Sequence, residues 1–280
     1  MKRILAIAVA ATLSLPGFAQ TWFTELFRES GVKGGIQGAA VFGDKFFQFH
    51  DHNTSISIFD LRTGALIQDI PTGEVKTWHN NNVNFSTVYY EESDRYPLVY
   101  ASQENIKEHR TVVWRITEDA GGVFSARIVQ TIIFPDPMQM GLYYPNLALD
   151  NENGKIYLTG YSLPSWNKGD NGNGVQLLRF PLPSPVSGET VYLGTGDIEA
   201  RFCNRFRIAT QGAAISGGKL YQSFGVPSLG ETRLVVTDLE TGRTEYESAL
   251  GGISDEPEGL GFWQGRIVIV CGKGGVYLSR

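Results

Sequence analysis

The sequence is short of cysteine and of positive charge. Its only two cysteines, Cys203 and Cys271, have neither the number nor the spacing of a disulfide framework, so we expect two buried free thiols. The chain has 24 Lys and Arg against 29 Asp and Glu, a net charge of −5. That balance lacks the basic footprint that nucleic-acid binding requires, and it also disfavours binding to anionic membrane surfaces.

The sequence also lacks long segments with the apolar spacing of a helix. Its apolar run at 4–15 is too short to cross a bilayer, so we expect no membrane span. That run follows Lys2-Arg3 and ends in small residues, the pattern of a secretory signal over residues 1–19. We predict cleavage between Ala19 and Gln20 and a secreted or periplasmic protein; the alternative is a buried N-terminal helix. Residues 20–280 then form one domain.

Two copies of one pattern are present. Gln37-Gly-Ala-Ala-Val-Phe-Gly-Asp-Lys and Gln211-Gly-Ala-Ala-Ile-Ser-Gly-Gly-Lys are each followed by aromatic residues and later by Asp-Leu-Xaa-Thr-Gly. Each copy predicts short strands joined by tight turns, since Gly-Asp and Gly-Gly tolerate the positive φ that hairpins need. A repeat of this length is typical of a propeller or a solenoid.

Weaker copies start near 82, 146 and 258, so five units are spaced by 45, 64, 65 and 47 residues. These lengths suit four-stranded blades, and we predict an all-β, five-bladed β-propeller of antiparallel blades, with a six-bladed propeller as the alternative. The last unit has only three strands before Arg280. We therefore expect Trp22 to Phe27 to close the ring as the outer strand of the last blade, because an unpaired edge invites aggregation.

Chemistry is expected where the innermost strands begin, at one mouth of the central channel. The five aligned positions there, which we call the mouth positions, are four amides and one carboxylate that can bond sugar hydroxyls, carbonyls or water. The predicted ligand-binding residues are Gln37, His79, Asn80, Asn82, Asn84, Tyr144, Asn146, Gln211, Glu256 and Glu258, of which the mouth positions are Gln37, Asn82, Asn146, Gln211 and Glu258. The alternative is that these side chains bond neighbouring blades and hold the ring shut.

A metal site is a weaker prediction. His50 and His52 share one face of a strand and could bind a divalent cation with Asp51, His79 or Glu258 nearby. Two ligands two residues apart are a weak signal, so we expect no cofactor.

The sequence resembles uncharacterised secreted five-bladed β-propeller proteins of Bacteroidetes. Gln37-Gly-Ala-Ala, His79-Asn-Asn-Asn-Val-Asn-Phe, Gln211-Gly-Ala-Ala and Glu256-Pro-Glu-Gly-Leu-Gly-Phe carry this resemblance. A lesser similarity is to lactonases of the gluconolactonase type, which implies a divalent cation bound by Glu258, Asn82 and Asn146.

Two functions therefore stand open. The first is a non-catalytic, monomeric binding protein for a glycan or a cell-envelope protein. The second is a hydrolase: a metal-assisted lactonase or esterase with Glu258 and with His79 as proton carrier, or a glycosidase that pairs Glu258 with Asp51 or Glu104. The sequence leaves undecided whether the chain is an enzyme.

Overall fold

Strands make up nearly all of the regular structure. The computed structural model describes residues 20–29, 35–51, 55–73, 79–104, 108–135, 137–164, 174–205, 207–230 and 232–280. The predicted signal and its cleavage site lie outside the described residues, apart from Gln20 itself. The strands, in chain order, are β1 (Gln20–Arg28), β2 (Ile36–Phe42), β3 (Lys45–His50), β4 (Ser55–Asp60), β5 (Leu66–Pro71), β6 (His79–Phe85), β7 (Val99–Glu104), β8 (Glu108–Glu118), β9 (Phe124–Pro135), β10 (Tyr143–Asp150), β11 (Lys155–Tyr161), β12 (Gly174–Pro181), β13 (Thr190–Tyr192), β14 (Ala200–Arg205), β15 (Thr210–Ser216), β16 (Lys219–Phe224), β17 (Arg233–Asp238), β18 (Thr244–Gly251), β19 (Pro257–Trp263), β20 (Arg266–Cys271) and β21 (Gly275–Ser279).

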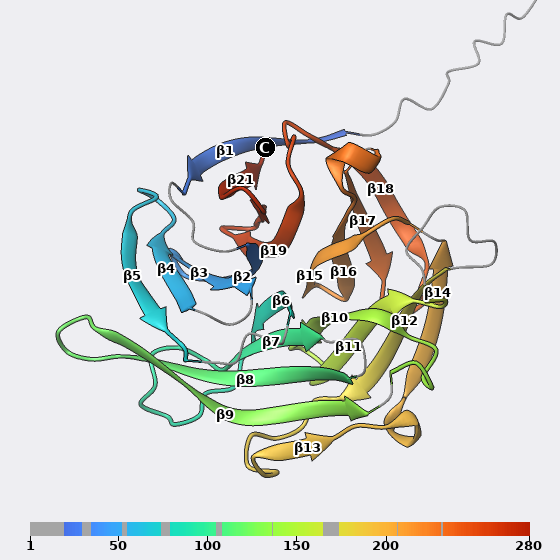
Figure 1. Ribbon diagram of the computed structural model, residues 1–280, viewed down its shortest axis with the longest axis horizontal. Helices are drawn as coiled ribbons and strands as arrows, with labels where there is room; N and C mark the ends of the chain where they lie inside the picture. Colours follow the sequence, from blue (N-terminus) through green and yellow to red (C-terminus); the bar gives the residue numbers. More distant parts are fainter. Residues whose placement is uncertain are drawn as a thin grey trace, which may run out of the picture.

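Of the 21 strands in the described residues, twenty group into five antiparallel sets of four around a common axis (Figure 1), and β13 is an additional strand beside β9. Set one is β2–β5, set two β6–β9, set three β10, β11, β12 and β14, set four β15–β18, and set five β19, β20, β21 and β1. The expected all-β propeller is confirmed. Apart from strands, the described residues hold two short 3-10 helices, η2 (Thr195–Asp197) and η3 (Pro227–Leu229). No helix in the described part of the chain is long and apolar enough to cross a membrane.

The N-terminal strand joins the two ends of the ring. Its second half pairs antiparallel with β21, with Phe23 opposite Ser279 and Thr24 opposite Leu278, so β1 is the outer strand of set five as expected. Its first half also pairs in parallel with β18 of set four, which the sequence did not suggest. Figure 1 shows β1 running along the outside of both sets. A single strand thus ties the last two sets together.

A second strand crosses between sets in the same way. After β12 the chain adds β13 in parallel to β9, at the outer edge of set two, and then returns as β14 to set three. The short, exposed segment has no apolar repeat that would predict it. Both crossing strands pair parallel to their neighbour, and both cover an outer edge that would otherwise be open.

The core lies between the sets rather than along the axis. Neighbouring sets pack aromatic side chains against one another: Phe49 of β3 meets Trp114 of β8 with ring centroids 6.4 Å apart, and Phe134 of β9 meets Phe180 of β12 at 5.3 Å. The second strand of set one, β3, is covered on both faces and is buried along nearly its whole length. This double burial explains why its sequence, with three phenylalanines, does not alternate.

We predict that ring closure depends on the inward face of β1. Phe23 is 3% exposed in the core of sets four and five, whereas its neighbour Trp22 is 50% exposed. Phe23→Ala should lower the free energy of unfolding by about 3 kcal/mol or more, because it leaves a cavity in the core. Urea denaturation measures this, with Trp22→Ala as the matched control costing less than about 1 kcal/mol. Equal losses in the two variants would show that β1 does not close the core.

Candidate functional site

The inner strands approach one another more closely than a side chain allows. A Cβ on Gly38 would lie 2.2 Å from the carbonyl oxygen of Asn81, and one on Gly212 would lie 2.5 Å from the backbone of Gly259. Atoms do not approach that closely, so both positions require glycine. These are the glycines of the repeated Gln-Gly-Ala-Ala, and the repeat therefore records where the inner strands touch.

Buried asparagines fasten these strands to each other. Asn82 is fully buried; its amide nitrogen donates to the carbonyl of Leu147 at 2.6 Å and to that of Ala213, and its backbone N–H donates to Asn146 Oδ1 at 3.0 Å. Asn146 in turn donates from its amide to the carbonyl of Gln211 at 2.6 Å. One chain of bonds thus links the inner strands β6, β10 and β15.

Two further predicted ligand residues also form hydrogen bonds to the backbone of neighbouring sets. Asn84 accepts a hydrogen bond from the backbone N–H of Leu149 at 3.0 Å and donates to the carbonyl of Ala213 at 3.1 Å. Asn80 is fully buried and donates to the carbonyl of His50 at 2.7 Å. For Asn80, Asn82, Asn84 and Asn146, these contacts match the alternative that the sequence left open: they hold the ring shut.

The remaining predicted residues lie nearer the surface, at the end of the ring where the inner strands begin, which we call the mouth. Gln211 donates to Glu256 Oε1 at 2.6 Å, and His79 Nδ1 lies 3.0 Å from Asp51 Oδ1. Tyr144 is 45% exposed at the start of β10. Gln37 is half-buried at the start of β2. These side chains are therefore partly exposed, in contrast to the buried asparagines behind them.

Glu258 is the buried acid of this mouth. It is 9% exposed, and no described side chain hydrogen-bonds its carboxyl group. Burial, reinforced by the negative charges of Glu256, Asp255 and Asp51, raises its pKa to about 9. A Cβ on Gly272 would lie 3.3 Å from Glu258 Oε1, so the glycine leaves room for the carboxyl. At neutral pH Glu258 is a protonated acid.

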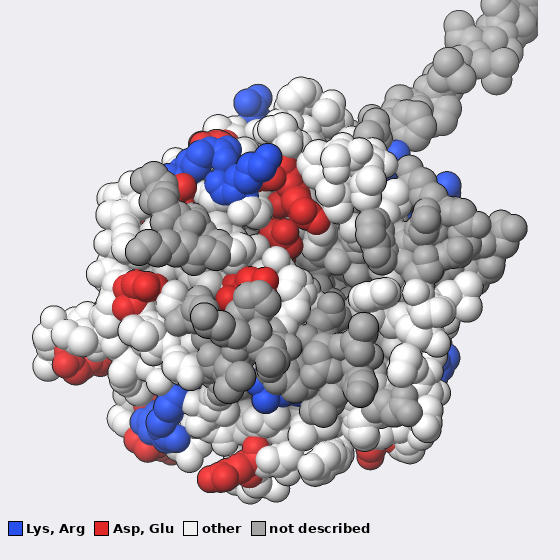
Figure 2. Space-filling model, in the orientation of Figure 1, with Lys and Arg blue, Asp and Glu red and all other residues white. Residues whose placement is uncertain are grey.

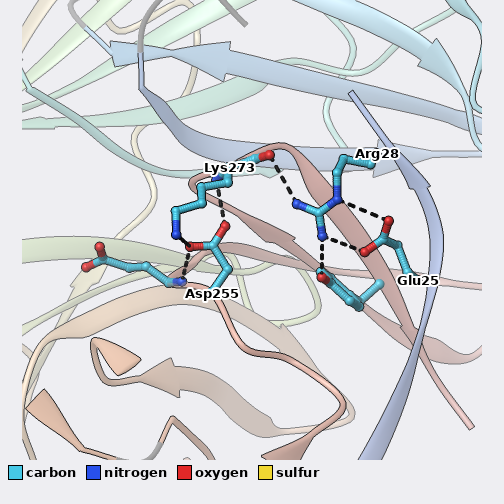
Figure 3. Close-up of polar contacts among 6 residues, drawn as sticks. Glu25, Arg28, Asp255 and Lys273 are labelled. Atoms are coloured by element: carbon cyan, nitrogen blue, oxygen red, sulfur yellow. Dashed lines mark hydrogen bonds and ion pairs between the residues drawn. The ribbon is translucent and has the colours of Figure 1, made fainter. Parts of the chain in front are cut away.

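The neighbouring carboxylates are held by the closing strand and the last loop, as Figure 3 shows. Arg28 of β1 donates to Glu25 at 3.2 Å and to the carbonyl of Lys273 at 3.3 Å. The Lys273 backbone N–H donates to Asp255 Oδ2 at 2.8 Å, and Asp255 Oδ1 accepts from the backbone N–H of Glu256 at 2.8 Å. Sequence reasoning missed Arg28 and Asp255, because only ring closure brings β1 beside this loop.

The end of the ring seen in Figure 2 carries negative charge. Acidic side chains gather around the centre of that face, with a group of basic side chains beside them. Among the mouth carboxylates, burial also raises the pKa of Glu256, opposed by the hydrogen bond from Gln211 and reinforced by Asp255. Burial and the charges of neighbouring carboxylates therefore both raise the pKa of Glu256 and of Glu258.

The weaker metal prediction finds little support in the described residues. His50 is buried and its Nε2 lies 2.8 Å from Ser57 Oγ, while burial lowers its pKa, an effect opposed by the charges of Glu29 and Asp69. His52 and the side chain of Glu104 lie outside the described part of the chain. No group of three His, Cys, Asp or Glu side chains that could hold a metal ion occurs in the described residues.

Both cysteines are free thiols, as expected, but the prediction that both are buried is wrong for one of them. Cys271 is buried and burial raises the pKa of its thiol, whereas Cys203 is exposed. Cys203 lies on β14, the outer strand of set three, where alternate side chains face solvent.

We predict that Asn82 acts through stability. Asn82→Ala removes the amide donor to the carbonyls of Leu147 and Ala213, of which Ala213 keeps a second donor in Asn84. A buried group left unpaired costs about 1–3 kcal/mol, and the lost side chain also leaves a cavity. Urea unfolding should show a loss of about 2–4 kcal/mol. The matched control is Asn204→Ala, which removes a single 3.4 Å bond to Thr237 and should cost less than about 1 kcal/mol. A well-folded Asn82→Ala protein of unchanged stability would contradict this assignment.

We predict that Glu258 makes stability fall as the pH rises. The folded protein holds its proton up to about pH 9, while the unfolded chain releases it near 4.5. The stability of the natural protein relative to Glu258→Gln should therefore be greatest below pH 4.5 and decline towards pH 9, by up to about 1.4 kcal/mol per pH unit. Denaturant midpoints measured from pH 4 to 9 give this difference.

The control for that series is Glu199, whose contribution to stability should change with pH in the opposite direction. The ion pairs of Glu199 with Lys155 and Arg179 lower the pKa of its carboxyl. Replacing it in Glu199→Gln should therefore weaken the protein at neutral pH and lose its effect in acid. A flat difference between the natural protein and Glu258→Gln would show that Glu258 ionises normally in the folded state.

Comparison with known proteins supports the fold alone. No protein-family model matches the sequence, and no curated protein matches it. Among solved structures, the chain is similar to the crystal structure of the glutaminyl cyclase of Myxococcus xanthus, with a TM-score of 0.57 and 10% sequence identity over 94% of this chain and 98% of that one. At that identity the likeness extends to the β-propeller architecture and not to the residues of a site.

Proposed function

We propose that the chain is a binding protein that takes a glycan at the mouth of its ring. The observation that carries this is the division of the polar side chains into two layers. The buried layer, with Asn82 and Asn146, fixes the strands. In the outer layer, Gln211 bonds Glu256 and His79 lies beside Asp51, and all three of Gln211, Glu256 and His79 keep part of their surface in solvent.

A layer anchored in this way suits a ligand with many hydroxyl groups. Amides and carboxyls both accept hydrogen bonds from hydroxyls, and the amide and the protonated Glu258 also donate. Because the groups are already positioned, little conformational entropy is lost on binding. Tyr144, 45% exposed, adds an aromatic face with a polar tip at the rim.

A glycan array followed by calorimetry tests the proposal. Tyr144→Ala should weaken binding of a glycan found on the array at least tenfold, about 1.4 kcal/mol. The matched control is Tyr192→Ala, which removes a 64% exposed tyrosine from β13 at the outer edge of set two. The proposal fails if no glycan binds, if the two variants lose affinity equally, or if a cell-envelope protein binds the mouth in place of a glycan.

The protonated state of Glu258 favours a second candidate, hydrolysis. A carboxyl with a pKa of about 9 is a proton donor at neutral pH. It would give its proton to the leaving oxygen of an ester, lactone or glycoside, while water supplies a hydroxyl group to the carbon and its remaining proton restores the acid. Assays with these three substrate classes should show turnover that Glu258→Gln abolishes.

A further inference from the structure

Glu258 is a buried carboxyl group without a side-chain partner among the described residues. More than nine-tenths of its surface is buried, yet no described side chain hydrogen-bonds its carboxyl group. A carboxyl buried to this extent without a protein partner costs stability. The side chain packs against Gly272, where a Cβ would lie 3.3 Å from Glu258 Oε1.

The groups around Glu258 are mostly acids. Glu256 and Asp255 precede it on the approach to β19, and Asp51 follows β3; all three charges act on its carboxyl. The neutral amide of Gln211 bonds Glu256, and His79 bonds Asp51. The facing cations are peripheral: Lys273 Nζ, 80% exposed, lies 3.8 Å from Asp255, and Arg28 bonds Glu25.

These acids attract positive charge, and the described residues place no cation beside Glu258. We propose that the bound glycan carries a protonated amine, which Glu258 and Glu256 bind as their ammonium ligand. This inference rests on the proposed function and makes it more specific: the ligand is an amino sugar with a free amine. A fully acetylated or neutral sugar would leave the carboxyl groups without their countercharge.

The exchange of protons can be written out. In the free protein Glu258 keeps its proton, because neighbouring acids and burial oppose its charge. When the ammonium group arrives, the opposite charge favours the carboxylate, so Glu258 gives its proton to the solvent. The amine stays protonated and no covalent bond changes. At pH 6, where the amine of the free sugar and the carboxyl of free Glu258 are both protonated, binding should therefore release about one proton for each ligand.

Matched oligosaccharides test this directly. Calorimetry at pH 6, in two buffers of different ionisation enthalpy, compares the tetramer of glucosamine with that of N-acetylglucosamine. The glucosamine tetramer should bind at least tenfold tighter and release about one proton, while the acetylated one should release none. Glu258→Gln should lose both the preference and the proton release. Glu152→Gln, in the exposed β10–β11 turn, should keep both.

Three other results would contradict either the ammonium proposal or the glycan-binding proposal. Equal binding of the two tetramers without proton release overturns the ammonium assignment and leaves the glycan-binding function standing. Binding of neither tetramer, nor of any glycan on the array, removes the function itself. Tighter binding of tetralysine than of either sugar assigns the amine to a peptide and overturns the amino-sugar proposal. If Glu258→Gln does not fold, Glu256→Gln provides the same comparison, with a smaller preference expected.

Discussion

Close approach of the inner strands is the constraint on which the rest of the structure depends. At Gly38 and Gly212 the backbone of one set touches that of the next, so no side chain can be accommodated. Strands brought this close leave carbonyl groups with no room for water, and buried carbonyls must then be paired by the protein itself. Asn82 does this for Leu147 and Ala213. Glycine therefore allows the inner strands to approach, and asparagine pairs the carbonyl groups that this approach buries.

That closure determines what the mouth can be. The asparagines behind the mouth donate to backbone carbonyls of neighbouring sets, whereas Gln37, Gln211 and Tyr144 are partly exposed at the mouth. The acids are placed by elements that meet only when the ring is complete: Arg28 comes from the first strand, while Lys273 and Asp255 come from the last set. The strand that closes the ring is thus also part of the support for the site.

The sequence revealed the features that repeat. Gln37-Gly-Ala-Ala and Gln211-Gly-Ala-Ala located two inner strands, and the short last unit indicated that β1 would be its outer strand. Structural features that occur only once in the chain were not predicted from the sequence. The strand β13 is three residues long and is defined by the edge it meets, not by its own pattern. The polar run at the start of β6 was visible, but whether Asn82 bonds a ligand or a carbonyl depends on distances between sets, which no local pattern contains.

Burial has opposite effects on stability at the mouth and among the asparagines behind it. Among these asparagines, each buried amide has a backbone partner, so burial stabilises the ring. One layer further out, Glu258 is buried without a partner among acids that repel its charge, which lowers stability at neutral pH. The fold could have avoided that cost with glutamine, as at Gln37 and Gln211, the corresponding positions of sets one and four. Destabilising groups of this kind are typical of functional sites. Set five therefore departs from the glutamine of sets one and four at a mouth position that is both buried and acidic.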